Sequence, residues 1–210
     1  MIRVFIVDDH AMLRRGIREI LTDSHDIEVV GEAADYTELR TKMRGLEIDV
    51  FLLDVNLPGK NGIDILKSLR EENPRVKALM LSMYPEDQYA VRALKAGAYG
   101  YLNKASAPEL LLTAVAQIMA GRKFITPALA QSLAESLSGD GEELPHNRLS
   151  DREFQTLCLM ASGKRLADIA AALSLSPKTI SVYRARILEK MGMSNNAELT
   201  HYALKHKLVE

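Results

Sequence analysis

Acidic side chains at the ends of apolar segments are the first sign of chemistry in this sequence. Asp8 and Asp9 end an apolar segment near the N-terminus, and Asp54 ends another that begins at Val50. Such segments are typical of strands buried on both faces of a parallel sheet. Because ligands of open α/β sheets bind at the carboxyl ends of the strands, we interpret Asp54 as the acceptor of a phosphoryl group.

Three carboxylates gathered at one edge of a sheet would repel one another unless a cation lay among them. Oxygen ligands with room for water suit Mg²⁺, and this ion would also offset the charge of an incoming phosphoryl group. Lys104 follows the last predicted strand, where its ammonium could hold a phosphate oxygen. Ser82 ends the strand before it, and its hydroxyl could donate a hydrogen bond to another oxygen.

Residues 1–121 show apolar segments that alternate with amphipathic ones, a pattern that predicts an α/β domain with a parallel, doubly wound sheet. We expect five strands, at 3–7, 27–33, 50–54, 76–82 and 99–102. We expect five helices, at 11–21, 36–46, 63 to about 74, 89–96 and 108–120. A length of about 120 residues is ordinary for one domain.

Residues 122–148 are predicted to be a linker, with a short helix that begins at Thr126-Pro127 and a flexible tether over 138–147. Residues 149–210 predict an all-α domain of four helices. Ser150 and Glu153 form a capping-box pattern at the first helix, Ser176-Pro177 opens the third, and Ser194 is expected to cap the fourth. Two short helices, a tight turn and a longer helix are typical of a helix-turn-helix unit.

Composition restricts the class of protein. The chain has 47% hydrophobic residues and a net charge of −1, a globular composition without a strong overall field. Its single cysteine, Cys158, excludes an internal disulfide and suits a reducing compartment. No apolar run approaches the roughly 18 residues of a membrane span, and the N-terminus turns acidic too early for a signal peptide, so we expect a cytoplasmic protein without a membrane partner.

Four segments of the first domain, MIRVFIVDDH, LLDVNLPGKNG, LMLSMYPED and AGAYGYLNKASAPEL, together resemble the receiver domain of bacterial response regulators. The segment LSDREFQTLCLMASGKRLADIAAALSLSPKTISVYRARILEKMG resembles the LuxR-type DNA-binding domain. Their order is similar to that of the NarL/FixJ group, and the resemblance leaves only the linker unmatched. It implies a flavodoxin-like receiver in a two-component phosphorelay that controls transcription, and a regulator rather than an enzyme.

The resemblance implies roles for the acidic residues. Asp54 would take a phosphoryl group from a phosphohistidine on a sensor histidine kinase. Asp9 would coordinate Mg²⁺ directly, Asp8 would do so directly or through water, and the backbone carbonyl of Asn56 would be a further ligand. Asn56 and Tyr84 flank the site and are expected to tune the lifetime of the phosphoryl group.

The resemblance also implies a switch. Lys104 would contact the phosphoryl group, Ser82 would move toward it, and Tyr101 would turn inward into the released space. Phosphorylation would favour a homodimer, because two linked helix-turn-helix units gain affinity for double-stranded DNA. RNA polymerase is a further candidate partner.

The predicted third helix, 176–191, would be the recognition helix in the major groove. Three residues are candidates for phosphate contacts: Lys178, Thr179 and Arg184. Three small residues stand at base-reading positions, Ser181, Val182 and Ala185, and Arg186 also faces outward. Some relatives carry lysines in place of Ser181 and Ala185, so specificity here would depend on Val182 and on DNA shape. Many relatives carry Asn-Lys in place of Leu166-Ala167, and this difference removes an expected phosphate contact and would weaken binding to the DNA backbone.

Two other classes of function compete with this interpretation. A Mg²⁺-dependent phosphatase that uses an aspartyl phosphate would need an acid at the position of Asn56, and an amide cannot transfer that proton. A receiver-type adaptor whose terminal domain binds protein rather than DNA is compatible with the few basic residues expected in the groove. The five histidines, which include His10, are interpreted as surface or structural residues.

Overall fold

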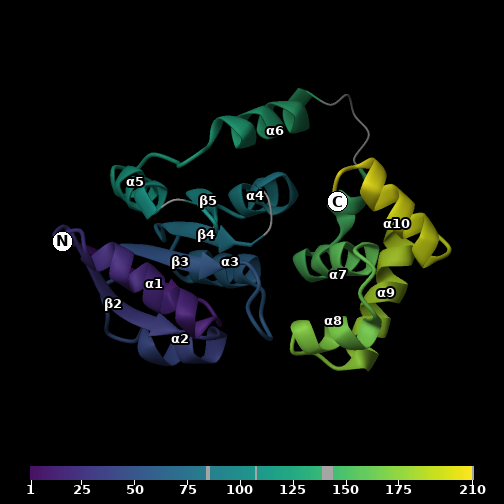
Figure 1. Cartoon of the computed structure of the whole chain (residues 1–210), viewed down its shortest axis with the longest axis horizontal. Coiled ribbons are helices and arrows are strands. Elements are labelled where there is room, and N and C mark those ends of the chain that lie inside the picture. The colour runs from purple at the N-terminus through teal and green to yellow at the C-terminus, as the bar shows by residue number, and fades with distance from the viewer. Residues whose placement is uncertain (84–85, 107, 139–143, 210) are drawn as a thin grey trace. The chain divides into compact units, whose positions relative to one another are not determined.

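The computed structural model describes residues 1–83, 86–106, 108–138 and 144–209 (Figure 1). The chain divides into two compact units, Met1–Ala134 and Glu135–Glu210. The division falls inside helix α6 (Pro127–Ser138) and therefore inside the predicted linker. No helix among the described residues is both long and apolar enough to span a membrane.

The first unit is a parallel five-stranded sheet with the strand order β2-β1-β3-β4-β5, which confirms the predicted fold class. The strands are β1 (Ile2–Val7), β2 (Ile27–Ala33), β3 (Val50–Asp54), β4 (Ala78–Ser82) and β5 (Gly100–Asn103). The helices between and after them are α1 (Ala11–Thr22), α2 (Tyr36–Lys42), α3 (Gly62–Glu72), α4 (Glu86–Lys95) and α5 (Pro108–Met119).

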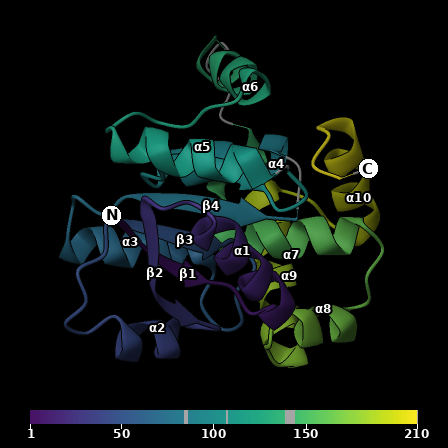
Figure 2. The same cartoon turned by 60° about the vertical axis from the view of Figure 1, so that its left-hand side comes forward.

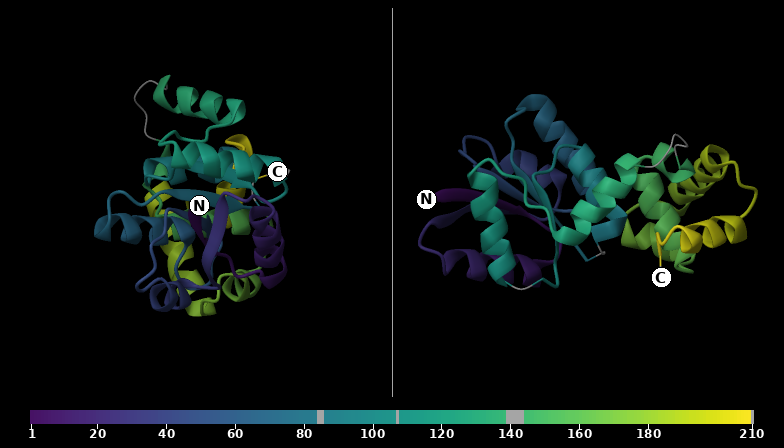
Figure 3. Two further views of the ribbon diagram at one scale, coloured as in Figure 1. Left: turned by 90° about the vertical axis from the view of Figure 1, so that its left-hand side faces the viewer. Right: turned by 90° about the horizontal axis from the view of Figure 1, so that it is seen from above.

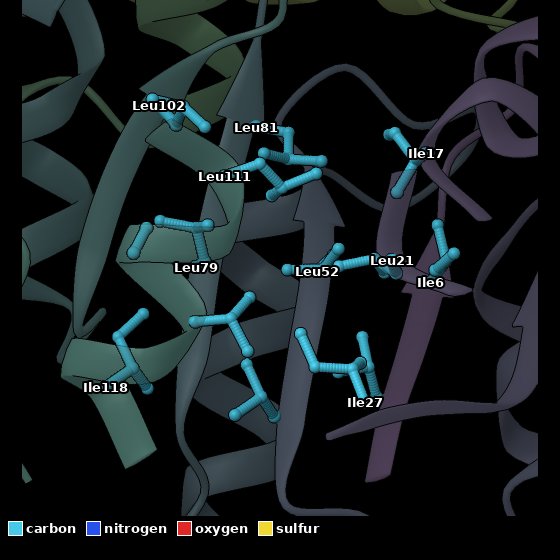
Figure 4. Close-up of a cluster of buried hydrophobic side chains, with 14 of the residues drawn as sticks. Ile6, Ile17, Leu21, Ile27, Leu52, Leu79, Leu81, Leu102, Leu111 and Ile118 are labelled. Atoms are coloured by element: carbon cyan, nitrogen blue, oxygen red, sulfur yellow. The ribbon is translucent and has the colours of Figure 1, made fainter. Parts of the chain in front are cut away.

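Helices cover the sheet of this unit on both sides (Figures 2 and 3). One face packs against α1 and α5, with Ile17 and Leu21 of α1 and Ile118 of α5 lying over strand residues such as Leu52 (Figure 4). In the central strands the alternate residues, such as Phe51, are also buried. Because side chains of a strand alternate between faces, the sheet has an apolar core on each side, as the uninterrupted apolar segments predicted.

Two predicted boundaries were wrong by more than two residues in this unit. Helix α2 ends at Lys42 rather than near residue 46, because the chain turns at Met43 and passes through a left-handed glycine, Gly45, at φ 75°. Helix α4 begins at Glu86 rather than at Tyr89, three residues earlier than expected.

The loop from β3 to α3 needs a glycine where the helix begins. The amide nitrogen of Gly62 donates to the carbonyl of Val55 at 3.1 Å, and a Cβ at Gly62 would lie 1.9 Å from the carbonyl oxygen of Asp54. The side chain of Asn61 caps the helix by accepting from the backbone nitrogen of Ile63 at 2.7 Å. Glycine therefore lets the start of α3 lie directly against the end of β3.

The described part of the second unit contains helices α7 (Asp151–Ala161), α8 (Leu166–Ala172), α9 (Pro177–Met191) and α10 (Asn196–Lys205). The capping box of Ser150 and Glu153 is confirmed, with both reciprocal hydrogen bonds present. The prediction that Ser194 caps the last helix was wrong. Asn195 is the N-cap residue, and its side chain accepts from the backbone nitrogen of Glu198 at 3.0 Å.

Part of the predicted tether over 138–147 forms regular structure. Residues 139–143 lie outside the described residues, but Pro145–Arg148 form a 3₁₀ helix, η1. The Nδ1 atom of His146 lies 2.8 Å from the hydroxyl of Tyr202 in α10. The end of the segment that the sequence suggested was flexible is therefore attached to the second unit by a side-chain hydrogen bond.

We expect Gly62→Ala to lower the free energy of unfolding of the first unit by about 3 kcal/mol, because backbone atoms at the end of β3 would have to shift. The matched control is Gly16→Ala in α1, where an added Cβ meets nothing within 4 Å. This control should stabilise the helix by up to about 1 kcal/mol. Urea unfolding of the full chain followed by circular dichroism measures both changes, and equal effects of the two substitutions would contradict the expectation.

Candidate functional site

The ends of β1 and β3 bring two buried carboxylates together. These strands are adjacent and parallel, with Val7 paired to Leu53, so the residues that follow lie side by side. Asp8 is 0% exposed and Asp54 is 1% exposed. This confirms that both stand at one edge of the sheet. The place of Asp54 at the end of a strand, before a loop, predicts an exposed side chain, and that prediction is wrong, because its carboxylate lies beside the buried side chains of Lys104 and Asp8.

Lys104 joins the two carboxylates. Its Nζ atom lies 2.6 Å from Oδ2 of Asp8 and 2.7 Å from Oδ2 of Asp54, and its side chain is only 2% exposed. The backbone nitrogen of Lys104 donates to the carbonyl of Ser82 at 2.7 Å, which fixes this residue beside the end of β4. One ammonium thus forms ion pairs with two buried carboxylates, so the cluster has an excess of negative charge.

Asp9 and His10 complete the cluster on the solvent side. Ligand atoms of Asp8, Asp9, His10 and Asp54 all lie within 4.8 Å of one another. The interpretation of His10 as a surface or structural histidine did not include a position in this cluster. Its adjacency to Asp8 and Asp9 was the only sequence signal that could have suggested it.

The pKa of Asp54 is raised above its ordinary value of 3.8, mainly because burial disfavours the charged form. The negative charge of Asp8 raises it further, whereas Lys104 and the backbone N–H of Asn56, which donates to Oδ1 of Asp54 at 3.0 Å, lower it. A buried carboxylate in this position gains from any additional cation that reaches it.

The cluster fits a divalent cation. Asp8 and Asp54 are buried with incomplete charge compensation, while Asp9 and His10 are exposed, so an ion could reach the oxygens from solvent. Carboxylate oxygens with space for water are ligands that Mg²⁺ prefers. When bound, the ion would supply positive charge that offsets the carboxylates and an incoming anion.

The two residues expected to act as a switch are both buried. Ser82 is 0% exposed and pairs with Asn103 across the β4–β5 ladder. Tyr101 is also 0% exposed, so it already occupies an interior position here. The roles of Ser82 and Tyr101 in switching stay predictions.

A surface hollow elsewhere in the first unit does not share this chemistry. It is lined by residues such as Arg3, Leu46, Phe51 and Val76, and it lies by the amino ends of the strands rather than the carboxyl ends. Arg3 is already paired with Asp49 at 2.9 Å. The acidic cluster is therefore the candidate functional site.

In the second unit, α9 presents the expected faces. Ile180, Ile187 and Met191 are buried and Tyr183 is half-buried. The residues predicted to face DNA are exposed: Lys178, Ser181, Val182, Ala185 and Arg186.

Two predicted phosphate contacts on α9 also have structural partners. The Nε atom of Arg184 donates to Oδ1 of Asn196 at 2.7 Å and so links α9 to α10. The hydroxyl of Thr179 lies 2.8 Å from that of the capping residue Ser176. Contacts of Arg184 and Thr179 with DNA stay predictions.

We expect Lys104→Met to lower the free energy of unfolding of the first unit by about 3 kcal/mol near neutral pH, because it leaves two buried carboxylates without their ammonium. Lys104 holds the pKa of Asp54 down, so its loss raises that pKa further. The folded state then binds more protons than the unfolded state, and stability falls as the pH rises above about 4. The destabilisation should therefore shrink in acid.

Thermal unfolding of the full chain between pH 4 and pH 8 measures this effect. Lys95→Met, at an exposed residue of α4, is the control and should change little. Adding Mg²⁺ should restore part of the stability lost in Lys104→Met. A loss that is the same at every pH would contradict the electrostatic explanation.

Comparison with known proteins agrees with this geometry. Residues 4–116 match the family described as "Response regulator receiver domain", and residues 147–203 match "Bacterial regulatory proteins, luxR family". The first match contains the acidic cluster, Ser82, Tyr101 and Lys104, and the second contains α7 to α9 and most of α10.

Relatives match over the whole chain. Response regulator UvrY of Escherichia coli is 36% identical over 209 residues, which cover 99% of this chain and 96% of UvrY. Response regulator GacA of Pseudomonas aeruginosa is 36% identical over 211 residues, 100% of this chain and 99% of GacA. RcsB from Salmonella enterica serovar Typhimurium, solved bound to promoter P1flhDC with the phosphomimetic BeF₃⁻, has a TM-score of 0.66 and 30% identity over 96% of this chain and 97% of its own. This chain therefore belongs to the NarL/FixJ-type response regulators, transcription regulators in which a receiver domain precedes a LuxR-type helix-turn-helix domain.

Proposed function

We propose that Asp54 is the phosphoacceptor through which this response regulator controls DNA binding by α9. The observation that carries the proposal is the buried pair of Asp8 and Asp54 at the carboxyl edge of the sheet, bridged by Lys104. Phosphoryl transfer to an aspartate requires a nucleophilic carboxylate, a neighbouring cationic side chain and acidic ligands close enough together to bind one cation.

The proposed reaction is a phosphoryl exchange with a sensor histidine kinase. A carboxylate oxygen of Asp54 attacks phosphorus of the kinase phosphohistidine, the P–N bond breaks, and the imidazole leaves with its electron pair. The Asp54 pKa, although raised by burial, must leave the carboxylate ionised for this attack. Lys104, already 2.7 Å from Asp54, then contacts an oxygen of the transferred group.

The proposed cation is Mg²⁺, held by Asp8, Asp9, Asp54 and the backbone carbonyl of Asn56. The close approach of the ligand atoms of the three aspartates supports this assignment. Asn56 is proposed to tune the phosphoryl lifetime by controlling water access; Tyr84, assigned the same role, lies outside the described residues.

The proposed output is a change at the ends of β4 and β5. Ser82 and Lys104 are linked through the backbone there, so a new anion on Asp54 attracts the ammonium and the hydroxyl toward one point. Tyr101, buried at 0% exposure, packs in the same strand pair. Rearrangement of these interior side chains is proposed to change the surface that the receiver presents to a second copy.

The proposed partners are a histidine kinase, double-stranded DNA and a second copy of the chain, and the proposed compartment is the cytoplasm. RcsB has been solved on promoter DNA, and in one structure as two dimers on two DNAs. The proposed domains are the receiver at 1–121, a linker at 122–148 and the DNA-binding domain at 149–210. RNA polymerase stays a candidate partner.

We expect a small phosphodonor with Mg²⁺ to add one phosphoryl group to the unaltered protein and none to Asp54→Asn. The amide of asparagine is a far weaker nucleophile than the carboxylate, so it should not accept the phosphoryl group. Because the amide has the shape of the carboxylate, the fold should remain intact. Intact-protein mass spectrometry gives the adduct, and thermal unfolding gives the stability. Asp23→Asn, at an exposed residue after α1, is the control that should still accept phosphate.

The same experiment separates the competing functions. No adduct on the unaltered protein would refute the proposal. Rapid hydrolysis of many phosphate esters would favour a phosphatase, and an adduct without salt-sensitive DNA retention would favour a protein-binding adaptor.

We expect Lys178→Ala to weaken DNA binding equally across sequences and to reduce the slope of log affinity against log salt by about one. Lys178 is exposed in the first turn of α9, where phosphate contacts orient a recognition helix. Arg15→Ala in α1 is the matched control, because Arg15 is 82% exposed but belongs to the first unit. Fluorescence anisotropy with promoter fragments at several salt concentrations measures the slope, and an unchanged slope would argue against a phosphate contact.

A further inference from the structure

His10 has an unusual position for a helix-capping residue. It is the N-cap residue of α1, but its side chain makes no capping hydrogen bond. The side chain is 64% exposed, so neither helix formation nor core packing requires an imidazole here. Instead the ring lies against the acidic cluster, with Nδ1 2.7 Å from Oδ1 of Asp9 and 3.3 Å from Oδ1 of Asp8.

The two oxygens of Asp8 have different partners. Oδ2 lies 2.6 Å from the ammonium of Lys104, which also lies 2.7 Å from Oδ2 of Asp54. Oδ1 instead accepts from the backbone nitrogen of His10 at 2.8 Å. Because Lys104 occupies the Oδ2 side, the Oδ1 side remains for a metal ion, and that is the side on which the imidazole lies.

The spacing of these atoms suits neighbouring ligands of one ion. In octahedral coordination with bonds of about 2.1 Å, adjacent ligand atoms lie about 3 Å apart. The distances from His10 Nδ1 to the oxygens of Asp9 and Asp8, 2.7 and 3.3 Å, fall on either side of that value. An alternative explanation is a simple hydrogen bond from Nδ1–H to Asp9, which would have no effect on the choice of metal.

We propose that His10 supplies an imidazole nitrogen to the cation site and shifts its preference from Mg²⁺ toward borderline divalent metals such as Ni²⁺. This inference rests on the proposed function, because it assumes that the acidic cluster binds a cation. Carboxylate and water ligands suit Mg²⁺, whereas imidazole suits Ni²⁺, Zn²⁺ and related ions. The neutral ring must carry its proton on Nε2 when Nδ1 binds the metal, and the exposed position of His10 allows exchange of that proton with water.

The consequence is a receiver whose metal occupancy depends on which divalent ions are available. Phosphoryl acceptance needs charge compensation at Asp54, and the ion that supplies it sets the arrangement of the ligands. His10 is thus a specificity-determining residue of the site, distinct from the aspartates that bind any divalent cation.

Isothermal titration of the full chain with Mg²⁺ alone and with Ni²⁺ alone tests the inference. In His10→Gln, whose amide can still donate to Asp9, and in His10→Ala, we expect the Ni²⁺ affinity to fall about tenfold or more. The Mg²⁺ affinity should change by about twofold or less, since its ligands are oxygens. Only the Ni²⁺ that excess Mg²⁺ displaces is counted, so binding at histidines elsewhere does not contribute.

Two controls complete the test. His25→Ala, at an exposed histidine of the same unit, should leave both affinities unchanged, and Asp9→Asn should lower both. Normal thermal unfolding of the two His10 variants confirms that they fold. Unchanged relative affinities for Ni²⁺ and Mg²⁺ in both His10 variants, with Mg²⁺ still bound, would overturn this inference alone; absence of Mg²⁺ binding in the unaltered protein would overturn the proposed cation site as well.

Discussion

One ammonium shared by two buried carboxylates is the interaction on which the rest of the site depends. Lys104 contacts Asp8 at 2.6 Å and Asp54 at 2.7 Å, and all three side chains are almost fully buried. Removing an ion from water costs several kcal/mol, and only a close partner recovers that cost. Burial raises the pKa of Asp54, and the negative charge of Asp8 raises it further. With one cation for two anions, charge compensation is incomplete, which leaves the cluster able to attract a further cation. The incomplete charge compensation that favours binding of a cation is therefore also a source of instability.

The scaffold must be rigid enough to keep these like charges together. Parallel pairing of β1 with β3 fixes the neighbouring positions of Asp8 and Asp54, and apolar layers on both faces hold the strands in register. The end of β3 also supports α3, because Gly62 allows the helix to begin against the carbonyl of Asp54. The repulsion between the carboxylates at one edge of the sheet is offset by the close packing of apolar side chains in the layers beneath it. Such a combination is common at functional sites.

Most of the fold could be predicted from the sequence because strands and helices are marked by local patterns of apolar and turn residues. Segment 50–54 and segment 27–33 have the predicted bounds. For segment 50–54, a continuous apolar run before turn residues leaves few alternatives. The ends of helices were harder to predict where two neighbouring residues could each provide the cap. Asn195 rather than Ser194 caps α10, since both residue types are good caps and only the backbone conformation decides between them. The burial of Asp54 and the place of His10 in the cluster depend on how the ends of separate strands come together in space, and no periodicity in the sequence records this.

Lys104 also offers a physical link through which the proposed phosphorylation of Asp54 would act at a distance. Its ammonium contacts the carboxylates, while its backbone nitrogen donates to Ser82 at 2.7 Å. A phosphoryl group on Asp54 would offer this ammonium a stronger partner than the carboxylates, because it carries more negative charge. Ser82 and Tyr101 are both 0% exposed, so side chains displaced there cannot simply move into water. Close-packed interiors respond to such displacement by adopting a second discrete arrangement rather than by deforming gradually. We therefore propose that a change of charge at Asp54 is converted into a change of shape at the edge formed by β4 and β5.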